Sequence, residues 1–178
     1  MESNILYQGK IQELVEDFID IGYMAENIEV LDTNEQKRVV KRSNPERSMT
    51  LLLSFPTCKE FQEEILSIDA FMSDIQVDIA CYFIFKERSE ETQALQKKLQ
   101  KFEVVYDSEE EFGNMYGTLI VNGSLEGKLT KSLFLISKDG AVFYLNMPQN
   151  IEDLFNLERL QAELNRAYVT YTGVGCHG

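Results

Sequence analysis

Cys58 and the residues around it have the clearest chemical potential in the sequence. It follows Pro56 and Thr57, which interrupt a five-residue apolar run, and after it apolar residues recur at helical spacing. Cys58 is therefore predicted to lie at a turn between a buried strand and the start of a helix. Free N–H groups at a helix N-terminus, together with the charge of Lys59, favour a thiolate there. A reactive thiol is one interpretation, and a buried structural cysteine is the other.

Two further cysteines are far from Cys58 in the sequence. Cys81 falls in the middle of the apolar run 77–85, where we expect it to serve packing only. Cys176 stands beside His177, the single histidine, close to the C-terminal end of the chain. Three widely spaced cysteines match neither a disulfide framework nor a zinc site. They are typical of a reducing compartment, so we expect a cytoplasmic protein.

The charge and motif content exclude several classes of function. The formal net charge of −13 argues against nucleic acid and anionic membranes as partners. No window approaches the ~18 apolar residues of a membrane span, and residues 1–10 lack the features of a signal peptide. A single histidine excludes most histidine-based catalytic triads and multi-imidazole metal sites. Because glycine-rich phosphate loops are also missing, we expect no cofactor and no metal.

A strand–helix–strand unit organises the middle of the chain. Apolar residues 49–53 predict a buried strand, residues 58–74 a helix, and residues 77–85 a second buried strand. Such a unit is right-handed and pairs its strands in parallel. We therefore expect residues 49–55 and 77–85 to be neighbours in one sheet, with Cys58 at the start of the helix between them.

Further elements flank this unit on both sides. For residues 4–19 two interpretations remain, a hairpin around Gly9 or a helix over 11–19. The other expected elements have clearer sequence patterns. These are strands at 28–32 and 37–41, a helix after Ser89, a strand at 102–106, a short helix opened by a capping box at 108–111, a hairpin of 133–136 with 141–145, and a helix from Asn150 to about Arg166. The order predicts an α/β fold with a central mixed sheet, as one domain over residues 1–178 with a flexible tail at about 168–178.

Four short stretches resemble motifs of the thiol peroxidases, a subgroup of the peroxiredoxins. Phe-Gly-Asn-Met-Tyr-Gly-Thr-Leu-Ile at 112–120 is similar to the family's F-G-x-x-Y-G-V-L-I, and 133–140 is similar to its A-V-F-V-L-D-K-D-G hairpin. Residues 22–28 resemble G-x-x-A-P-D-F, with Glu26 in place of the proline, and 52–56 resemble L-I-S-V-P. The resemblance runs from about residue 5 to 166 and implies a thioredoxin-like fold.

The resemblance also implies an activity. A thiol peroxidase reduces hydrogen peroxide or small organic hydroperoxides through a cysteine sulfenic acid, and here Cys58 would be the attacking thiol. Pro56 would shape the loop, Thr57 would bond the thiolate and the peroxide, and Lys131 would lower the thiol pKa. The usual position of the resolving cysteine holds none, so the enzyme would be one-cysteine in type or would use Cys176. A thioredoxin-like reductant and a homodimer are further implications.

The departures from the family pattern leave a second function open. Pro56 is only two residues before Cys58, where the family's loop reads roughly P-S-x-D-T-P-V-C. Either the loop has lost about five residues, or Phe55 takes the position of the family's threonine. Lys131 replaces an arginine and lacks its planar fork. Phe61 occupies the second cysteine position of a C-x-x-C motif. The alternative is a redoxin-fold protein without peroxidase activity that acts as a thiol-disulfide partner, a redox sensor or a binding protein.

Overall fold

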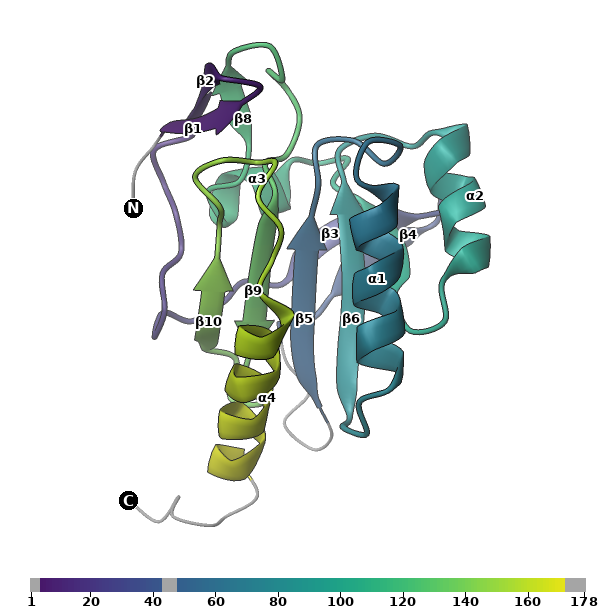
Figure 1. Ribbon diagram of the computed structural model, residues 1–178, viewed down its shortest axis with the longest axis vertical. Coiled ribbons are helices and arrows are strands. Elements are labelled where there is room, and N and C mark those ends of the chain that lie inside the picture. Colours follow the sequence, from purple (N-terminus) through teal and green to yellow (C-terminus); the bar gives the residue numbers. More distant parts are fainter. Residues whose placement is uncertain (1–3, 43–47, 172–178) are drawn as a thin grey trace.

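Strand β5, Met49–Ser54, lies at the centre of the larger sheet in the computed structural model, which describes residues 4–42 and 48–171 (Figure 1). All six of its residues are buried. It pairs in parallel with β6, Ile79–Phe85, and antiparallel with β9, Ser132–Ile136. The predicted parallel pairing of the two apolar runs is thereby confirmed, with Leu51 opposite Cys81. A strand buried on both faces needs the continuous apolar sequence found here.

The larger sheet is mixed, as the sequence predicts. Within the described residues its strand order is β10–β9–β5–β6–β7–β3–β4. Strands β5, β6 and β7 are parallel, and the antiparallel strands lie outside them. The remaining strands of this sheet are β3 (Ile28–Asp32), β4 (Lys37–Val40), β7 (Glu103–Tyr106) and β10 (Val142–Asn146).

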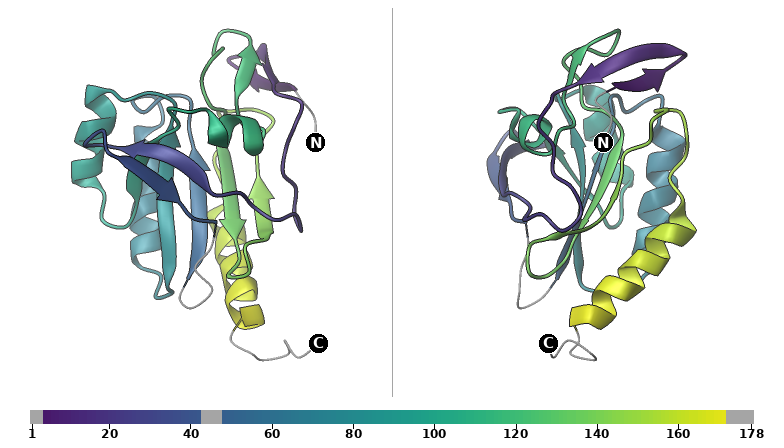
Figure 2. Two further views of the ribbon diagram at one scale, coloured as in Figure 1. Left: turned by 180° about the vertical axis from the view of Figure 1, so that it is seen from behind. Right: turned by 90° about the vertical axis from the view of Figure 1, so that its left-hand side faces the viewer.

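Helices cover the two faces of this sheet unequally. Helices α1, Gln62–Ser73, and α4, Leu157–Tyr171, lie over one face, and the short helix α3, Glu111–Met115, lies on the other (Figures 1 and 2). Leu51 and Leu53 belong to the core under α1 and α4, whereas Leu52 belongs to the core that contains α3. This alternation is the period of two that a strand imposes on its side chains.

A smaller sheet forms at one end of the molecule from β1 (Asn4–Tyr7), β2 (Lys10–Leu14) and β8 (Ile120–Asn122). Of the two alternatives for the N-terminal region, the hairpin is the one found. Gln8 and Gly9 have φ values of 51° and 75°, as a tight two-residue turn requires. The buried Gln12 side chain joins this hairpin to the 123–127 loop, because its Oε1 accepts from the Leu125 N–H at 2.8 Å.

Two further predicted elements begin at other residues than expected, the short helix after 108 and the final helix. Helix α4 begins at Leu157 rather than after Asn150, and the Asn156 side chain accepts from the Arg159 N–H at its first turn. Asn150 instead accepts from the Glu152 N–H in a local turn. The capping box at 108–111 is also absent, since the buried Asp107 carboxylate accepts from the first N–H groups of α3. Asn and Asp side chains form both kinds of contact, so the pattern alone does not separate them.

Helix α4 extends farther than predicted. It continues to Tyr171, so residues 168–171 are helical where the sequence predicts the beginning of a flexible tail. The rest of the predicted tail, residues 172–178, lies outside the described residues. The expected fold class, an α/β fold with a central mixed sheet flanked by helices, is confirmed.

The buried carboxylate of Asp69 generates a prediction about stability. It accepts from the N–H groups of Gln100, Lys101 and Phe102 at 2.8–3.0 Å and so ties α1 to the segment entering β7. We expect Asp69→Asn to lower the free energy of unfolding by about 2–4 kcal/mol, because an amide turns a donor toward these N–H groups. Urea denaturation measures this change. The exposed control Asp74→Asn should stay within about 0.5 kcal/mol, and an equal effect of the two substitutions would contradict the assignment.

Candidate active site

Cys58 lies in the loop between β5 and α1, before the helix itself begins. Its carbonyl accepts from the Phe61 N–H at 3.2 Å, and Phe61 is the N-cap of α1. The side chain is buried, with 5% of the residue exposed. Its Sγ–H points to the first turn of α2, Glu90–Lys98, and donates to the Glu91 carbonyl at 3.8 Å. The predicted turn between strand and helix is therefore correct, but α1 begins at Gln62, so the expected helix start at Cys58 is wrong. The thiol faces α2.

The electrostatic environment of Cys58 differs from the prediction. Burial raises the pKa of the Cys58 thiol, the Glu91 carboxylate raises it further, and Lys98 opposes them. The expected lowering of this pKa by a helix N-terminus and Lys59 is therefore wrong. Desolvation penalises the thiolate more than the nearby charges favour it.

The Cys58 thiol lines a cavity of about 270 Å³. The cavity is bounded by the β5–α1 loop, the segment from β6 into α2, and Lys128. Its lining residues are Pro56–Lys59, Phe85–Ser89, Glu91, Thr92 and Lys128. Thr57 Oγ1 is buried and has no hydrogen-bond partner among the described residues. An unsatisfied buried hydroxyl is costly, and Thr57 is next to Cys58 in the chain. Thr57 and Cys58 thus line the same cavity, and the Thr57 hydroxyl has an unused hydrogen-bonding capacity.

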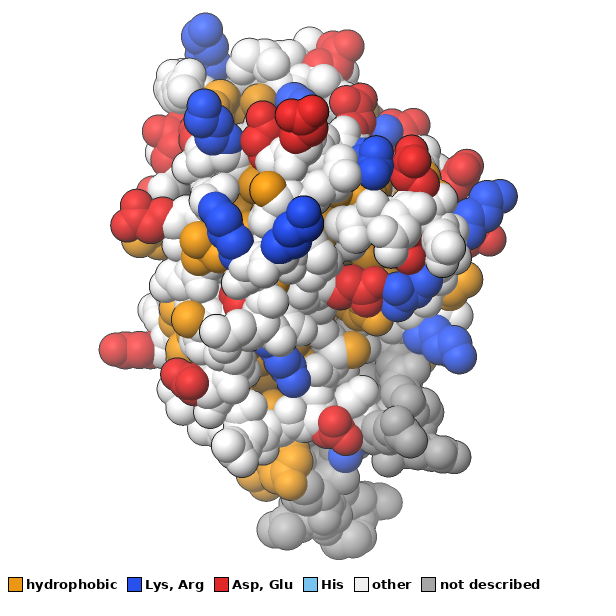
Figure 3. Space-filling model, turned by 90° about the vertical axis from the view of Figure 1, so that its right-hand side faces the viewer, with side chains coloured by type: hydrophobic (Ala, Val, Ile, Leu, Met, Phe, Trp, Pro, Cys, Tyr) orange, Lys and Arg blue, Asp and Glu red, His pale blue; other side chains and the backbone are white. Residues whose placement is uncertain are grey.

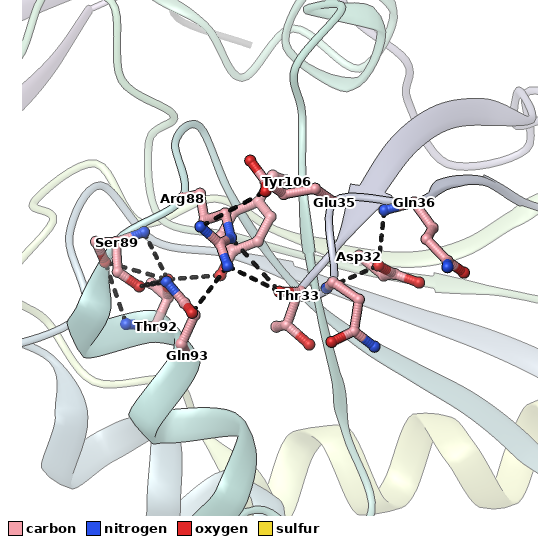
Figure 4. Close-up of polar contacts among 10 residues, drawn as sticks. Asp32, Thr33, Glu35, Gln36, Arg88, Ser89, Thr92, Gln93 and Tyr106 are labelled. Carbon is pink, nitrogen blue, oxygen red and sulfur yellow. Dashed lines mark hydrogen bonds and ion pairs between the residues drawn. The ribbon is translucent and has the colours of Figure 1, made fainter.

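The start of α2 is held rigidly beside this cavity (Figure 4). Ser89 Oγ accepts from the Thr92 N–H at 3.1 Å, and Thr92 Oγ1 accepts from the Ser89 N–H at 3.1 Å, which completes a capping box. Thr92 Oγ1 also shares a 2.6 Å hydrogen bond with the Tyr106 hydroxyl from β7. These contacts fix the backbone carbonyl of Glu91 relative to Cys58.

Arg88 lies at the rim of the same cavity. Its guanidinium donates to Gln93 Oε1 at 2.9 Å and to the Thr33 carbonyl at 3.4 Å, and it lies 3.9 Å from the Glu35 carboxylate (Figure 4). Sequence reasoning does not single out Arg88, Glu91 or Tyr106. The sequence indicates only that Ser89 begins a helix. These residues are distant from Cys58 in the sequence, and folding brings them close to it.

Lys131 is in a different place from the one its predicted role requires. It is fully buried, and its ammonium donates to the Glu64 carboxylate and to the Asp153 carbonyl. The Phe155 ring lies 4.8 Å from Nζ. Burial lowers the pKa of Lys131, and the hydrogen bond to Glu64 opposes this. The described lining of the Cys58 cavity does not include Lys131.

Of the remaining predicted site residues, some lie together at the cavity and others lie elsewhere. Pro56, Thr57 and Cys58 come together in one cavity. Cys81 is buried in β6, and desolvation raises the pKa of its thiol to about 12, as suits a packing role. Cys176 lies outside the described residues. In the described ranges, no group of three or more His, Cys, Asp or Glu residues is placed to hold a metal, and no helix is long and apolar enough to cross a membrane.

The stretch 112–120 serves the fold rather than the cavity. The Phe112 and Tyr116 rings stack at 4.8 Å, and the Tyr116 hydroxyl donates to the Glu26 carbonyl at 2.6 Å and accepts from its N–H at 3.1 Å. Gly117, with φ of 76°, would bring a Cβ to within 2.6 Å of the Asp17 carbonyl oxygen. These contacts attach the segment before β3 to the sheet.

Comparisons with known proteins agree with this fold and identify the family. Residues 31–164 match the model of the redoxin family. A stretch of 67 residues is 37% identical to the thiol peroxidase of Campylobacter jejuni and covers 38% of this chain and 37% of that protein. A stretch of 49 residues is 43% identical to the thiol peroxidase of Helicobacter pylori, over 28% of this chain and 30% of that protein. The chain thus matches about a third of the length of these curated relatives.

Solved structures match over nearly the whole chain. A peroxiredoxin-like protein from Aquifex aeolicus has a TM-score of 0.85 at 17% identity, over 94% of this chain and 98% of that one. A thiol peroxidase from Chromobacterium violaceum has a TM-score of 0.81 at 14% identity, with the same coverage. At these identities the similarity establishes the fold.

The raised pKa of Cys58 predicts the pH dependence of its alkylation. In a single-thiol protein carrying Cys81→Ser and Cys176→Ser, the iodoacetamide reaction should have its midpoint above the value of about 8.5 for a free thiol. Glu91→Gln should lower this midpoint, because it removes a charge that opposes the thiolate. The control Glu90→Gln changes the same helical turn and should leave the midpoint in place. A midpoint below about 7 would show a thiol activated as the sequence suggested.

The Lys131–Glu64 ion pair predicts a loss of stability without a change in thiol chemistry. Lys131→Met should lower the free energy of unfolding by about 3–5 kcal/mol, because it leaves the Glu64 carboxylate without its cation. The alkylation midpoint of Cys58 should not move. Urea denaturation and the alkylation profile measure the two effects, and the exposed Lys97→Met is the control. A midpoint shift of about one pH unit would return Lys131 to the thiol site.

Proposed function

The chain belongs to the redoxin family, and we propose that it is a thiol-dependent peroxidase that works through Cys58. The observation that carries the proposal is the cavity that Cys58 and Thr57 line together, with the Thr57 hydroxyl buried and without a partner among the described residues. The matches to thiol peroxidases, each over part of the chain, support it. The substrates would be hydrogen peroxide or small organic hydroperoxides, as a cavity of about 270 Å³ allows.

The proposed reaction uses the residues that line the cavity. The Cys58 thiolate attacks one oxygen of the peroxide, a sulfur–oxygen bond forms, and the oxygen–oxygen bond breaks. Cys58 becomes a sulfenic acid, and the departing oxygen takes up a proton to give water or an alcohol. Thr57 would donate a hydrogen bond to the departing oxygen, whose negative charge develops in this step. Because the thiol pKa is raised, the rate should increase with pH.

The sulfenic acid must then be reduced. A thiol of the reductant attacks the Cys58 sulfur and releases water, and a second thiol resolves the mixed disulfide to regenerate Cys58. We propose that a thioredoxin-like protein is the reductant. We also propose that this chain forms a homodimer and acts in the cytoplasm. Cys176 would act as the resolving cysteine if its thiol attacked the sulfenic acid, releasing water and forming a disulfide with Cys58 that the reductant then reduces; otherwise the enzyme is one-cysteine in type.

A second candidate function has specific support. Cys58 is buried with a raised pKa, and Lys131 is paired with Glu64. Both features suit a redoxin-fold protein without peroxidase activity that acts as a thiol-disulfide partner, a redox sensor or a binding protein. Peroxide turnover separates the two functions.

Cysteine substitutions test the proposed activity. With a dithiol reductant in excess, Cys58→Ser should abolish peroxide consumption. Cys81→Ser should leave it unchanged, because Cys81 lies within β6 and is not among the residues that line the cavity. Loss of turnover in Cys176→Ser with retained first oxidation would make Cys176 the resolving residue. Wild-type protein that consumes no more peroxide than Cys58→Ser does would favour the redoxin-fold alternative.

The unpartnered hydroxyls of Thr57 and Thr130 provide a sharper test. Both are buried without a partner among the described residues, but only Thr57 lines the cavity. Thr57→Val should slow oxidation of Cys58 by about tenfold or more, through loss of a transition-state hydrogen bond. It should leave stability unchanged or higher, since an unsatisfied buried hydroxyl is removed. Thr130→Val should have the same effect on stability and none on the rate; equal rates in the two variants would remove Thr57 from the mechanism.

A further inference from the structure

The cavity at Cys58 is basic, although the chain as a whole is acidic. The sequence has 17 Lys and Arg against 30 Asp and Glu. Among the residues that line the cavity the balance is reversed, since the acidic residues are Glu87 and Glu91 and the basic residues are Lys59, Lys86, Arg88 and Lys128. Clefts lined by one sign of charge concentrate molecules of the opposite sign. The cavity should therefore favour anionic molecules over neutral ones.

The basic residues converge from three separate segments. Lys59 comes from the β5–α1 loop, next to Cys58, and Lys86 and Arg88 come from the segment between β6 and α2. Lys128 comes from the loop before β9. The side of the molecule that carries α2 shows several Lys and Arg side chains among the acidic ones (Figure 3). Segments distant in sequence thus bring positive charge to one place.

Part of this positive charge is available to a ligand, on Lys59 and Lys128, whereas Arg88 also donates to Gln93 and to the Thr33 carbonyl. Lys86 and Arg88 have long ion pairs, at 3.8 Å to Glu110 and 3.9 Å to Glu35. Across the described ranges, neither Lys59 nor Lys128 forms an ion pair with an acidic side chain. The first turn of α2 also borders the cavity and adds the positive end of a helix dipole.

We propose that the substrate of Cys58 carries an anionic group, as a carboxylate-bearing organic hydroperoxide does. The carboxylate would lie among Lys59, Lys128 and the neighbouring cations, and the hydroperoxide would reach Cys58 and Thr57. The cavity, at about 270 Å³, is near the lower limit for small-molecule sites, so the substrate is small. This inference rests on the proposed peroxidase function for its reaction and on the cavity charge for its specificity.

Paired alkylating reagents test the charge preference without any peroxide. Iodoacetate is anionic and iodoacetamide neutral, and both form the same bond with a cysteine thiolate. In the Cys81→Ser, Cys176→Ser protein at fixed pH, the iodoacetate-to-iodoacetamide rate ratio at Cys58 should exceed that of 2-mercaptoethanol by about threefold or more. The ratio should fall as salt is added, because the basic residues at the rim are exposed to screening.

Charge-reversal variants locate the effect. Lys59→Glu should lower the ratio by about threefold or more, because it places a negative charge beside the thiol. Lys10→Glu makes the same change in net charge on an exposed residue of β2, and it should leave the ratio unchanged. A wild-type ratio equal to that of 2-mercaptoethanol, or equal effects of the two variants, would overturn the proposal.

A binding experiment tests the same charge preference if neither alkylating reagent reaches Cys58. Titration calorimetry with 4-isopropylbenzoate and its neutral analogue 4-isopropylbenzamide should show tighter binding of the carboxylate, weakened by Lys59→Glu. Equal binding of the two compounds, or binding of neither, would overturn the proposal. Neither arm depends on turnover, so a selective site without peroxide consumption would refute only the peroxidase function, and turnover without selectivity would refute only the anionic substrate.

Discussion

The buried ammonium of Lys131 constrains the structure around the candidate site. A charge removed from water must be paired, and Lys131 is paired by the Glu64 carboxylate and the Asp153 carbonyl. The other oxygen of Glu64 accepts from the Phe155 N–H at 2.9 Å. The entry to β9, the first turn of α1 and the segment before α4 are thereby joined. The short loop between β5 and α1 is held between these anchored elements.

This constraint determines which groups act on Cys58. Lys131 is used in the core, and the thiol instead faces the first turn of α2, where it donates to the Glu91 carbonyl. Burial and Glu91 together raise its pKa, so little thiolate is present at neutral pH. The site therefore differs from one in which a cation holds the thiol ionised. Its reactivity depends on the position of α2, which the Ser89–Thr92–Tyr106 contacts fix.

Local patterns predicted much of the fold and less of the site. The apolar runs 49–53 and 77–85 and the helical period between them were sufficient for β5, α1 and β6, because burial of a strand on both faces requires such a sequence. Asn150 and Ser108 were misleading because their side chains suit turns and helix caps equally. The pKa of Cys58 was not predictable, since Glu91 is 33 residues away in sequence. The role of Lys131 was likewise set by Glu64, a partner that only the fold brings near.

Detection of a sulfenic acid on Cys58 tests the central claim most directly. The Cys81→Ser, Cys176→Ser protein would be mixed with one equivalent of hydrogen peroxide in the presence of dimedone, and the adduct located by peptide mass spectrometry. The peroxidase account predicts a dimedone adduct on Cys58 that forms faster as pH rises, and more slowly in Thr57→Val than in Thr130→Val. Cys58 that remains unmodified while 2-mercaptoethanol is oxidised under the same conditions would contradict it.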